Sequence, residues 1–124
     1  MKALDWSERV AVLKGSLLDP IPEGRPVDVV VSNPPYIPTG EIDGLSPEIS
    51  KHEPRLALDG GTDGLDIYRT LIPQAAARAR MAVLVEHGDG QHQAIAELMR
   101  AAGLHEISEH KDLTGTVRVV AGLK

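Results

Sequence analysis

The sequence predicts an α/β layered fold, in which strands and helices alternate along the chain. Three observations indicate it: a valine-rich run typical of a buried strand, two segments with apolar residues at helical spacing, and turns rich in proline and glycine. The predicted elements are strands at 9–15, 27–32, 81–86, 104–109 and 117–121, and helices at 63–80 and 90–102.

The strand at 27–32 is rich in valine, as expected of a central strand buried on both faces. Pro34 and Pro35 end it, because proline has a fixed φ and no N–H to donate to a neighbouring strand. Asn33 is therefore expected at the carboxyl end of a strand. Open α/β sheets bind their ligands at this end.

Both predicted helices carry apolar residues on one face. These residues are Leu65, Tyr68, Leu71, Ile72 and Ala75 in the first helix, and Ile95, Leu98 and Met99 in the second. The second helix is expected to end at Gly103. Before the first helix lies a long irregular segment, residues 34–62. Its length and charged residues favour an active-site flap, and Gly60, Gly61 and Asp63 indicate a turn at its end.

The four residues Asn33-Pro34-Pro35-Tyr36 carry groups suited to a planar –NH2 group. The Asn33 side chain offers an acceptor oxygen, and the Pro34 carbonyl offers a second. Two acceptors would hold both hydrogens of the amine and orient its lone pair, while the Tyr36 ring packs against its plane. This combination of two acceptors and an aromatic ring indicates a site that alkylates an amide or exocyclic amine nitrogen.

The Asn-Pro-Pro-Tyr run resembles the signature of S-adenosylmethionine-dependent methyltransferases that act on glutamine N5 or adenine N6. Further stretches resemble the protein-glutamine branch, which methylates peptide chain release factors. They are HEPRLALDGG at 52–61, DGLDIYR at 63–69, VEHG at 85–88 with Gln91, and KDLTG at 111–115. The resemblance covers about residues 15–122, in the family's order.

The resemblance implies a partial class I methyltransferase sheet, which is Rossmann-like. The full strand order of such a sheet is 3-2-1-4-5-7-6, with strand 7 antiparallel. The chain would supply strands 4 to 7 as one block, and the segment near Val12 would be strand 3. The family's first strands, glycine-rich loop and helical substrate domain have no counterpart in the sequence. We therefore expect residues 1–124 to form the C-terminal portion of a catalytic domain, as a single domain.

That expectation leaves one edge of the strand at 27–32 bare, and a bare apolar edge recruits another strand. Either residues 10–13 pair with this edge, or two copies of the chain associate there.

The implied cofactor is S-adenosylmethionine, with Ser16, Leu17 and Asn33 as the expected contacts. Ser16 stands where the family has an acidic residue that accepts from the adenine amino group. A hydroxyl accepts such a bond without a charge. Leu17 would pack on the adenine face. Asp19 remains an alternative acceptor through a shift of register.

The implied reaction is N5-methylation of a release-factor glutamine. Asn33, Pro34 and Tyr36 are the expected catalytic residues. Substrate binding is expected from Asn33, Pro34, Pro35 and Tyr36 together with Glu53. For Glu86, at the end of a predicted strand, packing and a site role are both open. Without the glycine-rich loop, the isolated chain is expected to have weak methyltransferase activity or none.

Two alternative functions remain: a fragment of an adenine-N6 DNA methyltransferase, and a non-catalytic remnant that binds a partner through its exposed edge.

Composition argues against several other classes. The net charge of −5 does not suit a surface for phosphate backbones. The absence of cysteine excludes a disulfide scaffold and fits a reducing cytoplasm, where we expect the protein. No apolar run reaches membrane-spanning length. His87 and His92 are not expected to form a metal site, because no other residue has ligand spacing.

Overall fold

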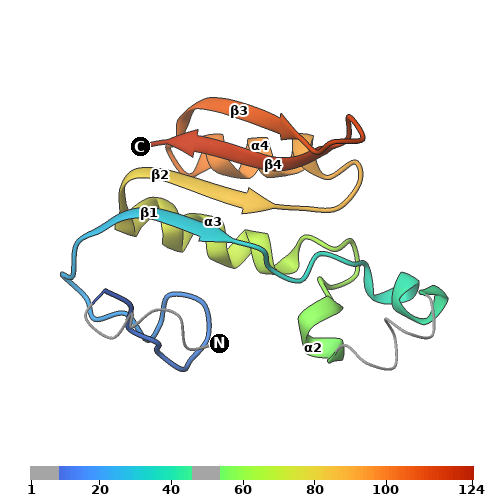
Figure 1. The fold of residues 1–124 in the computed structure, drawn as a ribbon, viewed down its shortest axis with the longest axis horizontal. Helices are drawn as coiled ribbons and strands as arrows, with labels where there is room; N and C mark the ends of the chain where they lie inside the picture. Colours follow the sequence, from blue (N-terminus) through green and yellow to red (C-terminus); the bar gives the residue numbers. More distant parts are fainter. Residues whose placement is uncertain (1–8, 46–53) are drawn as a thin grey trace.

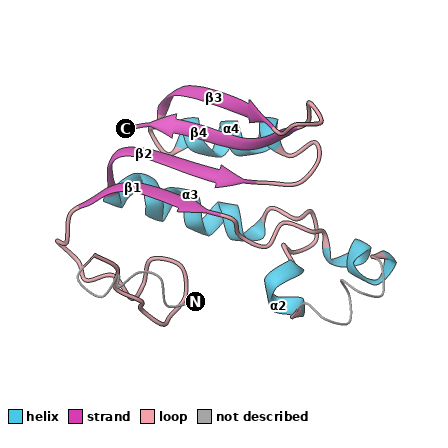
Figure 2. Cartoon of the chain, in the orientation of Figure 1, coloured by secondary structure: helices cyan, strands magenta, loops and turns pink. Residues whose placement is uncertain are grey.

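The computed structural model describes residues 9–45 and 54–124, which form one four-stranded sheet with two helices packed behind it (Figure 1). The elements in chain order are β1 (Val27–Ser32), η1 (Thr39–Gly44), α2 (Arg55–Leu58), α3 (Asp66–Arg78), β2 (Ala79–Glu86), α4 (His92–Ala101), β3 (His105–Lys111) and β4 (Val117–Leu123). Helices and strands alternate through most of this order, so the predicted α/β class is confirmed (Figure 2).

The strands lie in the order β1-β2-β4-β3. β1 and β2 run parallel, with α3 in the connection between them, whereas β4 is antiparallel to both β2 and β3. In this register Val31 lies beside Leu84, and Leu84 lies beside Ala121. The order and the directions are those expected for strands 4, 5, 7 and 6 of a class I methyltransferase sheet. The predicted partial sheet is therefore confirmed.

The core lies between the sheet and the two long helices. Its largest fully buried apolar side chains come from both layers and are Val83, Val85 and Val120 from the strands and Tyr68, Ile72, Ile95 and Met99 from the helices. Tyr68 is the only aromatic residue among them, and its hydroxyl donates a hydrogen bond to the carbonyl oxygen of Glu86 over 2.5 Å. Burial raises the pKa of the Tyr68 hydroxyl, so this group stays a donor.

The predicted helix at 63–80 is shorter than expected at both ends. At its start, the Asp63 carboxylate accepts from the Leu65 N–H over 3.0 Å. Because this bond forms a turn, the helix begins only at Asp66. At its end, Ala79 already pairs with Val27 in the sheet, so residues 79–80 belong to β2. α4, β3 and β4 agree with their predictions to within two residues at each end.

The predicted strand at 9–15 is wrong. These residues form no strand, and the side chains of Val10, Val12 and Leu13 are 50%, 92% and 53% exposed. A strand needs a neighbour for its N–H and C=O groups, and β1 pairs with β2 alone in the described part of the chain. The expected pairing of residues 10–13 with the edge of β1 is therefore not formed.

The irregular segment at 34–62 contains more structure than expected where it is described. It includes η1 and α2, and its two ends are joined by a parallel bridge between Ile37 and Asp59. Asp59 also accepts from the Thr39 hydroxyl over 2.6 Å and from the Gly61 N–H over 2.9 Å. These bonds hold the segment beside the end of β1.

None of the described helices has the length and hydropathy that a membrane crossing requires.

The Tyr68 hydrogen bond makes a testable contribution to stability. We expect Tyr68→Phe to lower the free energy of unfolding by about 1 to 3 kcal/mol, because the buried Glu86 carbonyl loses its donor. Urea unfolding followed by circular dichroism measures this change. Tyr36→Phe is the matched control: its hydroxyl makes no hydrogen bond to the described residues, so its effect should be small. Equal effects of the two substitutions would contradict the assignment.

Candidate functional site

A cavity of about 690 Å³ lies where the chain segments after β1 and β2 meet. Because β1 and β2 are parallel, their carboxyl ends reach the same edge of the sheet. The cavity wall includes polar and aromatic groups from both segments and from the turn before α3: Tyr36, Glu41, Asp63, Gly88, Asp89 and Gln91. A concave site at this edge is where an α/β fold is expected to bind a ligand.

The Asn-Pro-Pro-Tyr run follows β1 directly, as predicted. Asn33 is exposed, Pro34 is buried, and Pro35 and Tyr36 are half-buried. Tyr36 lies in the cavity wall, whereas Asn33 and Pro34 stand just before it at the strand end. The Asn33 side chain makes no hydrogen bond to any described residue, so both its amide oxygen and its –NH2 group are available to a ligand.

Two glycines allow the segments around Tyr36 to approach closely. A Cβ atom on Gly88 would stand 2.9 Å from Cδ1 of the Tyr36 ring. A Cβ atom on Gly64 would stand 2.4 Å from the Tyr36 carbonyl oxygen, and Gly64 also has a φ of +80°. The ring of Tyr36 is therefore packed against the backbone of the loop after β2, and its position depends on both glycines.

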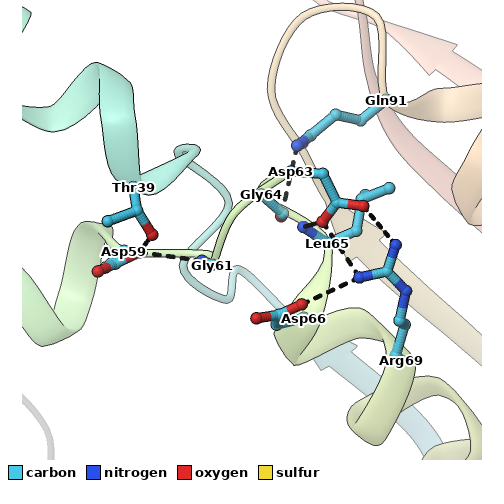
Figure 3. A network of polar contacts seen from close by, with 9 residues as sticks. All are labelled: Thr39, Asp59, Gly61, Asp63, Gly64, Leu65, Asp66, Arg69 and Gln91. Atoms are coloured by element: carbon cyan, nitrogen blue, oxygen red, sulfur yellow. Dashed lines mark hydrogen bonds and ion pairs between the residues drawn. The ribbon is translucent and has the colours of Figure 1, made fainter.

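Gln91 joins these segments through its side-chain amide. Its Nε2 group donates to the Tyr36 carbonyl over 2.9 Å and to the Gly64 carbonyl over 3.4 Å. Its Oε1 atom accepts from the Gly88 N–H over 2.9 Å. Figure 3 shows the Gln91 side chain reaching the turn at Gly64.

Two carboxylates of the cavity wall are held by arginines. Asp63 pairs with Arg69, which also reaches Asp66 over 3.0 Å (Figure 3). The Arg69 hydrogen bond holds the pKa of Asp63 below its usual value. Asp89 pairs with Arg118 over 2.9 Å. Glu41 is the third carboxylate of the wall, so the wall has one more carboxylate than the two arginines that pair with it.

The turn between β3 and β4 sets the position of Arg118. The Asp112 carboxylate accepts from the backbone N–H of Thr114 over 2.8 Å and from Arg118 over 3.1 Å. The Thr114 hydroxyl is the main reason that the pKa of Asp112 lies below its usual range. Asp112 therefore takes part in turn chemistry, and it also connects that turn through Arg118 to the cavity wall.

Glu86 is the last residue of β2, and His87 follows it. The Glu86 side chain is half-buried, and its backbone carbonyl holds Tyr68. His87 is fully buried with its Nδ1 atom 2.6 Å from the Gly88 carbonyl. Burial lowers the pKa of His87, so its ring is neutral near pH 7. The described residues contain no group of three His, Asp or Glu side chains arranged to hold a metal ion.

The structure does not bring the expected cofactor contacts Ser16 and Leu17 to the cavity. The turn that contains them packs beside the end of α3, where Arg78 donates to the carbonyl of Pro22 over 2.8 Å. This is the edge at which β2 begins, opposite to Asn33. The roles of Ser16 and Leu17 stay predictions. The expected substrate contact Glu53 lies outside the described residues.

Sequence reasoning did not assign a role to Gln91 or Arg118, which both contact the cavity wall. The partners of Gln91 come from positions 36, 64 and 88, so no local pattern connects them. A signal was present in the glycines: Gly64 stands where two backbone segments touch, and Gly88 stands where the backbone meets the Tyr36 ring. Glycine positions of that kind indicate close approach before a structure is known.

Comparison with known proteins gives one consistent result. A release factor glutamine methyltransferase of Caulobacter vibrioides is 49% identical over 98% of this chain and 42% of its own length. Its counterpart from Bradyrhizobium diazoefficiens is 52% identical over 80% of this chain and 34% of its own length. No protein-family model matches the chain.

Among solved structures, the release-factor-specific protein-(glutamine-N5) methyltransferase of Alicyclobacillus acidocaldarius is 33% identical, with a TM-score of 0.49. That match covers 82% of this chain and 50% of the other. The chain spans less than half the length of the curated relatives named above. By its sequence, the chain belongs to the release factor glutamine methyltransferase family.

Proposed function

We propose that this chain carries the amide-binding part of a site that methylates N5 of a glutamine side chain in peptide chain release factors. The observation that supports it best is the Asn-Pro-Pro-Tyr run at the carboxyl end of β1, beside a cavity, in a chain of this family. In this proposal, residues 1–124 are the C-terminal portion of the catalytic domain. Asn33, Pro34 and Tyr36 act on the substrate amide.

Asn33 and Pro34 hold the amide through its two hydrogens. The Asn33 side-chain oxygen and the Pro34 carbonyl oxygen accept them, and the Tyr36 ring packs against the amide plane. An amide nitrogen is a weak nucleophile because its lone pair is delocalised. Acceptors on both hydrogens raise its electron density, and they stabilise the positive charge that grows on nitrogen during transfer. The methylated nitrogen then loses a proton to water.

S-adenosylmethionine, when bound, supplies an electrophilic methyl group on a sulfonium sulfur. The described residues fit this cofactor in part. The cavity wall has the Tyr36 ring and the Glu41 carboxylate, which suit a cation, whereas its other two carboxylates are paired with arginines. The sequence has no Gly-x-Gly-x-Gly loop, and Ser16 and Leu17 lie away from the cavity. We therefore propose that cofactor binding, and with it turnover, requires residues that this chain does not contain.

The acidic cavity also favours a protein substrate over DNA. Glu41, Asp63 and Asp89 line it, and the net charge of the chain is −5. A phosphate backbone approaching the same edge would meet carboxylates at close range, which is unfavourable. A peptide loop with an uncharged glutamine avoids this cost.

The role of Asn33 can be tested in a fusion protein. In it, this chain is joined to the part of the Caulobacter vibrioides relative that has no match in this chain. We expect Asn33→Ala to lower methyl transfer to a release factor by about 100-fold or more, because one acceptor for the amide is lost. Binding of S-adenosylmethionine, measured by calorimetry, should stay nearly unchanged. Thr62→Ala, at an exposed position in the same segment, is the control. Unchanged transfer by the Asn33 variant would refute the role.

We also propose that two copies of the chain associate through the outer edge of β1. β1 has no neighbour on that side among the described residues, and Val31 is 73% exposed. An unpaired strand edge beside apolar side chains is a template for a second chain.

Sedimentation equilibrium tests this association. We expect the wild-type chain to form dimers as its concentration rises, and Val31→Lys to remain a monomer, because a charge beside the edge opposes pairing. Leu113→Lys, in the exposed turn between β3 and β4, adds the same charge elsewhere and should leave association intact. A monomeric wild-type chain at all concentrations would contradict the proposal.

A further inference from the structure

Gln91 is placed to control how the Asn33–Tyr36 turn sits against the loop after β2. It is the residue just before α4, yet its side chain makes no capping bond to its own helix. Its amide is instead shared among three separate backbone segments, at Tyr36, Gly64 and Gly88. A side chain that links three loops and leaves its own helix uncapped has a positioning role at those loops.

The three contacts require the chemistry of a primary amide. Two of the partners are carbonyl oxygens, so they need a donor, and the third is an N–H group, which needs an acceptor. The opposite orientation of the amide would set its oxygen against two carbonyls and its –NH2 against an N–H. Glutamate has the same shape, but its ionised carboxylate has no donor. Asparagine has the amide but is one methylene shorter.

Other bonds hold the neighbouring backbone without Gln91. The Ile37 N–H donates to the Leu58 carbonyl over 3.0 Å, and the Gly60 N–H donates to the Ile37 carbonyl over 2.8 Å. These bonds tie the segment to the end of α2. They do not reach the loop after β2, where Gly88 packs against the Tyr36 ring. Loss of Gln91 should therefore leave the fold intact and release the Tyr36 ring from Gly88.

We propose that Gln91 is a positioning residue, whose amide fixes the Tyr36 ring against Gly88 and so sets the orientation of the Asn33–Pro34 acceptors. The relevance of this orientation to methyl transfer rests on the function proposed above. Asn33 makes no hydrogen bond to the described residues. The end of β1 holds the turn that contains it on one side, and the Gln91 bond to the Tyr36 carbonyl holds it on the other. The substrate glutamine then meets acceptors that are already aligned.

The substitution Gln91→Glu turns this claim into a pH experiment. Above the pKa of the introduced carboxyl, the carboxylate faces the carbonyls of Tyr36 and Gly64, and the ring should leave Gly88. Below that pKa, the protonated carboxyl donates to the Tyr36 carbonyl and still accepts from Gly88, so the wild-type contact should return. The Gly88 N–H favours the ionised carboxyl, whereas the two carbonyls and the carboxylates of the cavity wall favour the protonated one. Because the second group is the larger, we expect this change above the ordinary glutamate pKa of about 4.3.

The measurement is the nuclear Overhauser effect between the Tyr36 ring protons and the Gly88 α-protons, recorded from about pH 4 to pH 7 on the whole chain. Gln93→Glu, at an exposed position on α4, is the matched control and should keep the contact throughout.

The other titratable groups near Gln91 are Glu41, Asp63 and Asp89 in the cavity wall, His87 beside Gly88, and His92, which is next in the chain and faces Glu109. Arg69 is paired to Asp63 and Arg118 to Asp89. They are common to the wild-type chain and both variants, so their titration cancels in the comparison. Contact in Gln91→Glu at neutral pH, or its loss at both ends of the range, would overturn the proposal.

Peptide binding separates this inference from the proposed function. A synthetic peptide with a central glutamine should bind Gln91→Glu more weakly than wild type at neutral pH and equally at low pH. If the wild-type chain binds no such peptide but the contact follows pH as described, the proposed function fails and the positioning role of Gln91 stands.

Discussion

The parallel pairing of β1 with β2 is the constraint on which the site depends. It places Asn33 and the loop that begins at His87 at one edge of the sheet, although they are separated by the whole of α3. Pro34 and Pro35 end β1 at that edge, and Gly88 lets the loop after β2 approach the Tyr36 ring. Without the parallel register, the acceptors of the Asn-Pro-Pro-Tyr run and the cavity wall would lie at opposite ends of the sheet.

Electrostatics around the cavity follow from contacts made by residues distant in the sequence. Arg118 on β4 holds Asp89 after β2, and Arg69 on α3 holds Asp63 in the turn before that helix. Each arginine fixes a carboxylate in the wall and offsets its charge, and Glu41 adds one further negative charge. Such a wall is compatible with the cationic methyl donor and the uncharged amide of the proposed function.

The parts of the fold that sequence predicts well are those with local signals. β1 ends as predicted because two prolines follow it, and the core positions of α3 and α4 follow from helical spacing. The strand expected at 9–15 failed because apolar residues form a strand only beside a partner. Gln91 could not be assigned from sequence, since its three partners are brought together by the fold alone. The Asn-Pro-Pro-Tyr run was recognisable because its chemistry is contained in four consecutive residues.

The most direct test of the account is a titration of the isotope-labelled chain with a glutamine-containing release-factor peptide, followed by nuclear magnetic resonance. The same peptide with leucine in place of glutamine is the control, because leucine has a similar size and no amide. We predict saturable shifts of the Asn33 side-chain –NH2 and of the Tyr36 resonances with the glutamine peptide alone. Equal shifts with both peptides, or none at Asn33 and Tyr36, would contradict the claim that this turn holds the substrate amide.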